Sequence, residues 1–335
     1  MQYEIADAIH SNNRAAATVP AGNMSRPRVM GGGAAVFLIA IALFPAACRR
    51  AAPPRAAAGA GPRMLRIVAA ENFWGSLVSQ LAGPRARLTS VITDPNADPH
   101  EYQSSAATAR AVADADYVIV NGAGYDSWCS RLLAASPAPR RMVLNVAEFL
   151  GKKPGDNPHF WYNPAYVNQV AARVEHDLAA LDPPDAASFQ KRYRALQTAL
   201  GQYQQRIAAI RRRFGGMKVA ATEDIFTYLA RAAGLDLISP PVFMEAVGAG
   251  NEPPAQSIVQ FEEQLKRASV LVYNKQTVTP LTGQMKNRAQ ADGIPVVGIT
   301  ETVQPPDASF EDWMDSQIVA LQVALEKTAG KRLGK

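Results

Sequence analysis

The sequence has 335 residues, of which 48% are hydrophobic and 19% are charged. This composition excludes an intrinsically disordered chain, and the length allows two domains of ordinary size. The formal net charge is +6, but the basic residues are scattered and form no stripe interleaved with aromatic residues. A nucleic-acid partner is therefore not expected.

The N-terminal region has the features of a targeting segment. Two basic residues, Arg26 and Arg28, precede an apolar run from Ala34 to Ala47. This run is shorter than the ~20 residues that a membrane span needs and is typical of a signal peptide. We predict a signal segment over 1–48, with an extended start, and a flexible Ala/Pro/Gly-rich tether over 49–64.

The apolar run ends in Ala46-Ala47-Cys48, and small residues before a cysteine resemble a bacterial lipobox. We therefore predict that Cys48 is lipidated, with ordinary signal cleavage near Ala47 as the alternative. The remaining cysteine, Cys129, cannot form an intrachain disulfide if Cys48 is lipidated, and we expect it to be a small buried hydrophobic residue.

After the tether, short apolar runs alternate with helical patterns, which predicts a parallel sheet covered on both faces. The predicted strands are 65–70, 88–92, 117–121 and 142–146, and the clearest helices are 73–81 and 108–115. The strand over 88–92 is expected to be buried. Together they indicate an N-terminal α/β lobe over 65–184.

A long helical pattern follows Pro184 and extends from Ala186 to Phe214, with apolar residues every three or four positions. Gly215-Gly216 would end it. A helix of this length spans roughly 40 Å, more than one lobe needs. It is either a long core helix or a rigid strut between two lobes, and we assign it residues 185–215.

The alternation resumes over 216–330, which we predict to be a second α/β lobe. The predicted strands are 218–221, 235–238, 270–273 and 296–299, and the predicted helices are 225–233, 254–267, 284–291 and 310–327. The expected fold class is therefore α/β, with two lobes that each contain a mainly parallel sheet covered by helices.

Two motifs carry candidate metal ligands. Asp98-Pro99-His100-Glu101-Tyr102 follows the second predicted strand, and Asn157-Pro158-His159-Phe160-Trp161 repeats the Pro-His pair before aromatic residues. In open α/β sheets ligands bind at the carboxyl ends of strands. The proline fixes its own backbone torsion and stiffens the turn that presents His100.

These motifs resemble those of the solute-binding proteins of ABC importers for zinc and manganese, which are usually Asp-Pro-His-x-Tyr and Asp-Pro-His-x-Trp. The resemblance extends from about Leu65 to about Leu325, and Asn157 and Asn163 replace the usual aspartates of the second motif. It implies a periplasmic or cell-surface receptor that carries one Zn²⁺ or Mn²⁺ per chain to a membrane permease. It also implies a lipid anchor, a monomer and a single rigid helix joining the lobes.

The resemblance also implies the ligand set. His100 and His159 would be joined by Glu223, after the first strand of the second lobe, and by Glu301, after the last strand, where the family usually has Asp. Two neutral imidazoles and two carboxylates balance a divalent cation. Imidazole suits zinc, and added carboxylates suit manganese. The side chains expected to shield the metal and support its ligands are Tyr102, Trp161 and Phe226.

Each acidic candidate also has an interpretation without metal binding, because Glu223 and Glu301 could be exposed carboxylates at the start of a following helix. A secreted metal-dependent hydrolase is an alternative function, although the sequence contains no His-Glu-x-x-His motif. A surface adhesin with a structural metal is another. Four protein ligands leave little room for a reactive water, so we expect a binding protein and not an enzyme.

Overall fold

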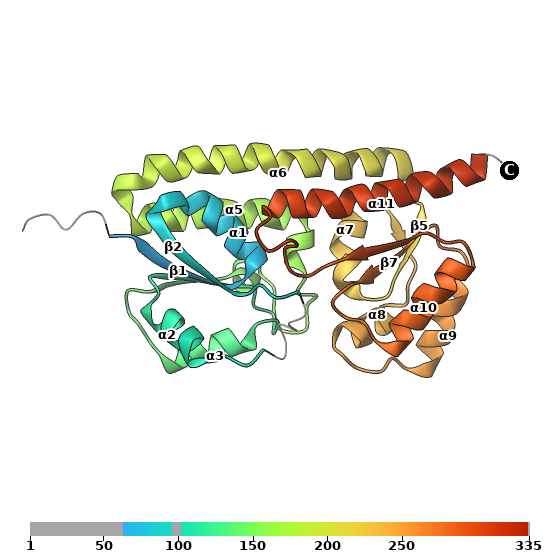
Figure 1. Ribbon diagram of the computed structural model, residues 1–335, viewed down its shortest axis with the longest axis horizontal. Helices are drawn as coiled ribbons and strands as arrows, with labels where there is room; N and C mark the ends of the chain where they lie inside the picture. Colours follow the sequence, from blue (N-terminus) through green and yellow to red (C-terminus); the bar gives the residue numbers. More distant parts are fainter. Residues whose placement is uncertain (1–62, 96–101, 334–335) are drawn as a thin grey trace, which may run out of the picture. The chain divides into compact units, whose positions relative to one another are not determined.

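The computed structural model describes residues 63–95 and 102–333 and contains two four-stranded sheets, with strand orders β2-β1-β3-β4 and β6-β5-β7-β8 (Figure 1). Every pair of neighbouring strands in these sheets is parallel. The predicted fold class is confirmed. Both sheets belong to one compact unit of the chain.

The first sheet is covered on both faces because its central strands alternate between two apolar layers. Its strands are β1 (Leu65–Glu71), β2 (Ala86–Ile92), β3 (Tyr117–Val120) and β4 (Met142–Asn145). In β1, Ile67 and Ala69 pack into the core beneath α1, α5 and α6, whereas Val68 and Ala70 pack against α2 and α3. Figure 1 shows these helices on opposite sides of the sheet.

Strand β2 differs from the prediction of a buried strand. It forms one edge of the sheet, and most of its residues are partly or fully exposed. In its first half, Ala86 and Leu88 alternate with the exposed Arg87 and Thr89, which is the pattern of a half-solvated strand. A short apolar stretch alone does not distinguish an edge strand from a central one.

The helices of the first lobe are α1 (Asn72–Ala82), α2 (Ala106–Asp114), α3 (Ser127–Ala135), α4 (Val146–Phe149) and α5 (Pro164–Leu181). Helix α5 was not among the predicted elements. Asn163 caps it by accepting hydrogen bonds from the backbone N–H groups of Ala165 and Tyr166, and Pro164 occupies the first turn. Cys129 on α3 is a free, buried cysteine, as expected.

The second sheet consists of β5 (Lys218–Ala221), β6 (Asp236–Leu237), β7 (Leu271–Asn274) and β8 (Val296–Ile299). Its helices are α7 (Thr227–Ala232), α8 (Pro241–Gly248), α9 (Ala255–Leu265) and α10 (Pro280–Ala291). Helix α8 was not predicted. It lies against the short 3₁₀ helix Asp224–Phe226 that follows β5.

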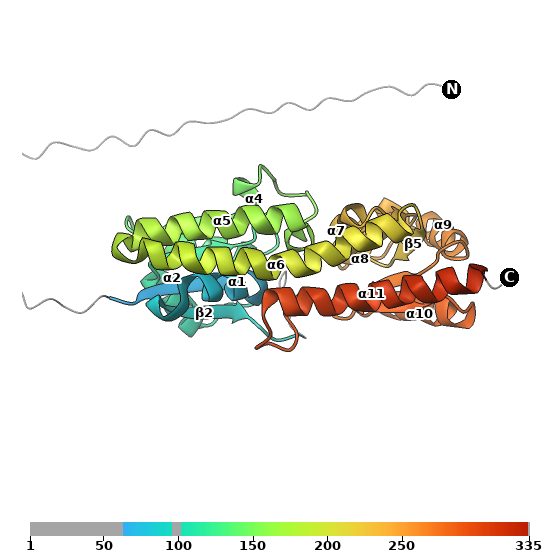
Figure 2. The same cartoon turned by 90° about the horizontal axis from the view of Figure 1, so that it is seen from above.

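Helix α6 (Ala186–Phe214) has the predicted bounds, and its predicted apolar stripe faces the core, with Tyr193 only partly buried. It packs against α1 and α5 of the first lobe and against α7 of the second. The last helix, α11 (Phe310–Leu333), packs along α6 and also contacts α1 and β8. Figure 2 shows the two helices side by side. Helix α6 therefore joins the lobes as predicted, and α11 contacts both lobes as well.

Within the described ranges, no helix combines the length and the apolar character required to cross a lipid bilayer.

Candidate metal centre

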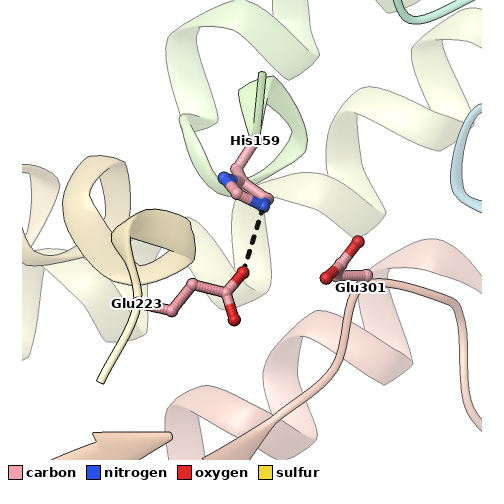
Figure 3. Close-up of side chains that lie close together, drawn as sticks. All are labelled: His159, Glu223 and Glu301. Carbon is pink, nitrogen blue, oxygen red and sulfur yellow. Dashed lines mark ion pairs between the residues drawn. The ribbon is translucent and has the colours of Figure 1, made fainter. Parts of the chain in front are cut away.

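Three buried side chains converge between the two sheets: His159, Glu223 and Glu301 (Figure 3). Each offers one donor atom, and these atoms all lie within 4.8 Å of one another. The imidazole Nε2 of His159 lies 3.7 Å from Oε1 of Glu223. Donor atoms at this spacing can reach a single divalent ion between them, because metal–nitrogen and metal–oxygen bonds are about 2.0–2.2 Å long.

The positions of the three residues follow from the topology. Glu223 lies two residues after the end of β5 and Glu301 two residues after the end of β8, so both stand at the carboxyl end of the second sheet. His159 comes from the first lobe, from the segment that leads into the 3₁₀ helix Phe160–Tyr162. The cluster is therefore built by both lobes, as expected for a site in the crevice outside the strand ends of α/β sheets.

Both carboxylates accept hydrogen bonds from neutral donors. The amide Nδ2 of Asn274, at the end of β7, lies 2.6 Å from Oε1 of Glu301 and 3.1 Å from Oε2 of Glu223. The hydroxyl of Tyr125 donates to Oε2 of Glu301 at 2.6 Å. These donors hold the two carboxylates in defined orientations without neutralising them.

The backbone beside Glu301 is also fixed. The side-chain carbonyl of Gln276 accepts hydrogen bonds from the backbone N–H groups of Glu301 and Thr302, at 2.6 and 3.0 Å. Gln276 itself donates its backbone N–H to the side chain of Asn274. One short segment after β7 thus positions both the side chain and the main chain of Glu301.

Burial dominates the electrostatics of the centre. Desolvation, followed by repulsion from Glu301, raises the pKa of Glu223 well above its ordinary value. Desolvation, followed by repulsion from Glu245 and Glu301, raises the pKa of the neighbouring Asp224 to about 7. Desolvation likewise raises the pKa of Tyr125, so its hydroxyl stays protonated and remains a donor. A divalent cation would favour the ionised carboxylates that burial disfavours.

Helix α8 packs closely against Glu223 and Asp224. A Cβ atom added at Gly248 would lie 2.9 Å from Oδ1 of Asp224 and 3.2 Å from Cγ of Glu223. Only a glycine lets the helix approach the Glu223–Asp224 segment without displacing one of these side chains.

The residues predicted from the sequence fall into three groups. His159, Glu223 and Glu301 lie together. Cys48 and His100 lie outside the described residues. Two of the predicted shielding residues differ in whether they contact the centre. The ring centroid of Trp161 lies 5.2 Å from that of His159 in an edge-to-face arrangement. Tyr102 instead packs on Trp128 and hydrogen-bonds Thr108.

Phe226, the third predicted shielding residue, is fully buried at the end of the 3₁₀ helix Asp224–Phe226, which directly follows Glu223. Sequence reasoning missed Tyr125, Asn274 and Gln276. One signal could have identified them, since each follows or ends a strand of a predicted parallel sheet, at the same edge as the ligands.

Comparison with known proteins supports a relationship to metal-binding receptors. The family model described as zinc-uptake complex component A, periplasmic, matches residues 67–324. The chain is 28% identical over 157 residues to the manganese-binding lipoprotein MntA of Halalkalibacterium halodurans, a match that covers 45% of this chain and 50% of MntA. It therefore spans about half the length of that relative.

The chain is also 22% identical over 224 residues to the manganese ABC transporter substrate-binding lipoprotein PsaA of Streptococcus pneumoniae, covering 62% of this chain and 70% of PsaA. In fold, it is similar to the solute-binding protein FpvC of Pseudomonas aeruginosa, solved in complex with Mn²⁺. That match has a TM-score of 0.66 and 20% identity, and covers 79% of this chain and 100% of FpvC. Since the family model spans most of the chain and both lobes, the protein belongs to the family of periplasmic zinc-uptake component A proteins.

Proposed function

We propose that this protein is an extracytoplasmic solute-binding protein that captures a divalent transition metal, Zn²⁺ or Mn²⁺, and delivers it to the permease of an ABC importer. The observation that carries the proposal is the buried convergence of His159, Glu223 and Glu301. The names of the related manganese-binding and ABC transporter substrate-binding lipoproteins agree with it. His100 would complete the ligand set as the family motif implies.

Binding, and not catalysis, is the role that this donor set supports. A metal that activates water keeps an open coordination position, whereas a set of His100, His159, Glu223 and Glu301 would surround the ion with protein ligands. Both oxygens of Glu301 are already engaged by Asn274 and Tyr125, which favours a carboxylate held as a ligand over one that exchanges protons with a substrate.

Titration calorimetry of the metal-stripped protein with Mn²⁺ and Zn²⁺ tests the proposal. The wild type should bind one ion per chain, and His159→Ala should lower the affinity by about tenfold or more. His176→Ala, which removes an exposed histidine of α5, is the matched control and should bind as the wild type does. If His159→Ala also kept the wild-type affinity, the ligand assignment would be wrong.

We further propose that the mature chain begins at Cys48 and is held at the membrane by a lipid. Support comes from the Ala46-Ala47-Cys48 sequence after an apolar run, and from relatives that are named lipoproteins. Mass spectrometry of the protein extracted from membranes should find a diacylglyceryl group on an N-terminal cysteine. An unmodified N-terminus at Arg49 or beyond would contradict this.

A further inference from the structure

The side chain of Asn157 has an orientation that its neighbours leave unambiguous. One end of its amide faces the backbone N–H of His159 at 2.9 Å, and the other end faces the backbone carbonyl of Asp224 at 2.8 Å. An N–H group can only donate and a carbonyl can only accept. The end near His159 is therefore the oxygen Oδ1, and the end near Asp224 is the nitrogen Nδ2.

This orientation determines which nitrogen of the His159 ring carries the proton. The ring Nδ1 lies 2.8 Å from the same Oδ1 of Asn157. Because Oδ1 only accepts, Nδ1 must be the donor, and in the neutral imidazole Nε2 then carries the lone pair and not the proton. Nε2 is also the atom that faces Glu223. Asn157 thus selects the tautomer that a metal ligand at this position requires.

The other half of the amide connects the two lobes. Asn157 precedes His159 in the first lobe, whereas its partner Asp224 directly follows Glu223 at the end of β5 in the second lobe. A second hydrogen bond also joins the Asn157 segment to the second lobe: the hydroxyl of Tyr228 on α7 donates to the backbone carbonyl of Asn157 at 3.0 Å. The main chain beside Glu223 is therefore tied to the Asn157 side chain, which orients His159.

We propose that Asn157 is a positioning residue that fixes the His159 tautomer and, through its N–H group, holds the His159 segment against the Glu223 strand end. This inference rests on the proposed function. An aspartate at position 157 could accept the two hydrogen bonds from His159, but it has no hydrogen to donate to the carbonyl of Asp224. The amide therefore serves both lobes, where a carboxylate would serve only one.

Two substitutions separate the two roles. Asn157→Leu removes the acceptor and the donor, whereas Asn157→Asp keeps the acceptor and removes the donor. Tyr228→Phe is the matched control, because it deletes the other hydrogen bond to Asn157 and leaves the amide in place. The readouts are the tautomer of His159, from ¹⁵N shifts of the metal-free protein, and backbone hydrogen exchange in the segments around His159 and Asp224.

The wild type should show a proton on Nδ1. Asn157→Asp and Tyr228→Phe should retain this tautomer, and Asn157→Leu should lose it and bind Mn²⁺ about 10–100-fold more weakly. Hydrogen exchange of the Asp224 segment should become faster in Asn157→Asp than in Tyr228→Phe. Exchange reports the lost N–H···O bond better than affinity does for this variant, because the added charge also attracts the cation.

An unchanged tautomer in Asn157→Leu would overturn the first role, and unchanged exchange in Asn157→Asp would overturn the second. Failure of the proposed function has a different signature. The wild type itself would then bind neither Mn²⁺ nor Zn²⁺, while the tautomer and the exchange rates would still report on Asn157.

Discussion

At the scale of single residues, the candidate centre contains neutral hydrogen-bond donors as well as charged candidate ligands. Glu223 and Glu301 are both buried, and repulsion between them adds to the desolvation that raises the pKa of Glu223. Asn274 and Tyr125 satisfy oxygens of this pair without adding charge. They therefore keep the carboxylates ordered while leaving their negative charge available to a cation.

Replacing Asn274 with leucine should weaken metal binding by about 10–100-fold, because it removes the amide that orients both carboxylates while roughly keeping the side-chain volume. Calorimetric titration with Mn²⁺ measures the effect. Asn168→Leu applies the same change to an exposed asparagine of α5 that bonds Gln204 on α6, and it should not alter the affinity. Equal affinities of the two variants would show that Asn274 has no positioning role.

The raised carboxyl pKa values also predict how stability depends on pH in the metal-free protein. Burial raises the pKa of Glu223, Glu71 and Asp126, and that of Asp224 to about 7. A group whose pKa is raised on folding stabilises the fold fully below its unfolded pKa of about 4, and this stabilisation is lost as the pH rises through the folded value. The melting temperature of the metal-free protein should therefore fall between about pH 4 and pH 8.

Bound metal should oppose this trend, because it binds the deprotonated carboxylates. The difference in melting temperature between metal-bound and metal-free protein should grow with pH in scanning calorimetry. In Glu223→Gln the metal-free decline should be shallower, since one of the titrating groups is gone. A metal-free melting temperature that rose over the same pH range would contradict the burial argument.

Among the described residues, the sequence singled out the candidate ligands, which lie together, but not the residues that support them. His159, Glu223 and Glu301 could be named because a family motif or a strand end singles them out. The roles of the supporting residues could not be predicted, although strand ends mark Asn274 and Tyr125, because Asn157, Asn274 and Tyr125 act through hydrogen bonds between segments far apart in the chain. Nothing in the local pattern of a sequence reports such a partner.

At the scale of elements, too, some features could be predicted from the sequence and others could not. The bounds of α6 could be predicted because its apolar residues repeat regularly, with Pro184 before it and two glycines after it. Helix α8 has only eight residues, mostly apolar, and its period cannot be distinguished from that of a strand. Strand β2 was predicted, but not as an edge, because the neighbour of a strand is decided by tertiary packing.

Helix α6 contains one interior glycine whose replacement should stabilise the protein. A Cβ atom at Gly201 would meet nothing within 4 Å, so Gly201→Ala should raise the free energy of unfolding by about 0.5–1 kcal/mol. Denaturant unfolding measures the change, and metal affinity should stay the same if α6 is a strut and not a hinge.

The same substitution in α1 provides the contrast. A Cβ atom at Gly75 would lie 2.1 Å from Oγ of Ser90 on β2, so Gly75→Ala should destabilise the protein. Weaker metal binding by Gly201→Ala, with stability raised as expected, would indicate that α6 bends during binding.

At the scale of the whole molecule, two helices restrain the lobes. Helix α6 passes from the first lobe to the second, and α11 begins beside α1 and, near its other end, donates a hydrogen bond from Thr328 to the backbone of Ser269 before β7. Two such connections resist bending more than one does. We expect metal binding to produce only a small rigid-body closure.

Small-angle scattering of the metal-free and Mn²⁺-bound protein tests this expectation, and the two radii of gyration should agree closely. A metal-free radius several ångströms larger would mean that the lobes open widely and that α6 and α11 do not act as struts. Thermal stabilisation by the same metal should accompany binding, by ~2.7 kcal/mol when free metal is a hundredfold above its dissociation constant.

The return of the chain to the first lobe has a consequence for biosynthesis. Asn72, at the start of α1, exchanges two hydrogen bonds with the backbone of Val303, which lies 231 residues later, and Ser76 accepts one from the backbone of Phe310. The first lobe to be synthesised is thus completed only by a segment that follows the last strand of the second lobe. We expect a nascent chain to remain incompletely folded until its final segment emerges, a state suited to threading through a secretory translocon.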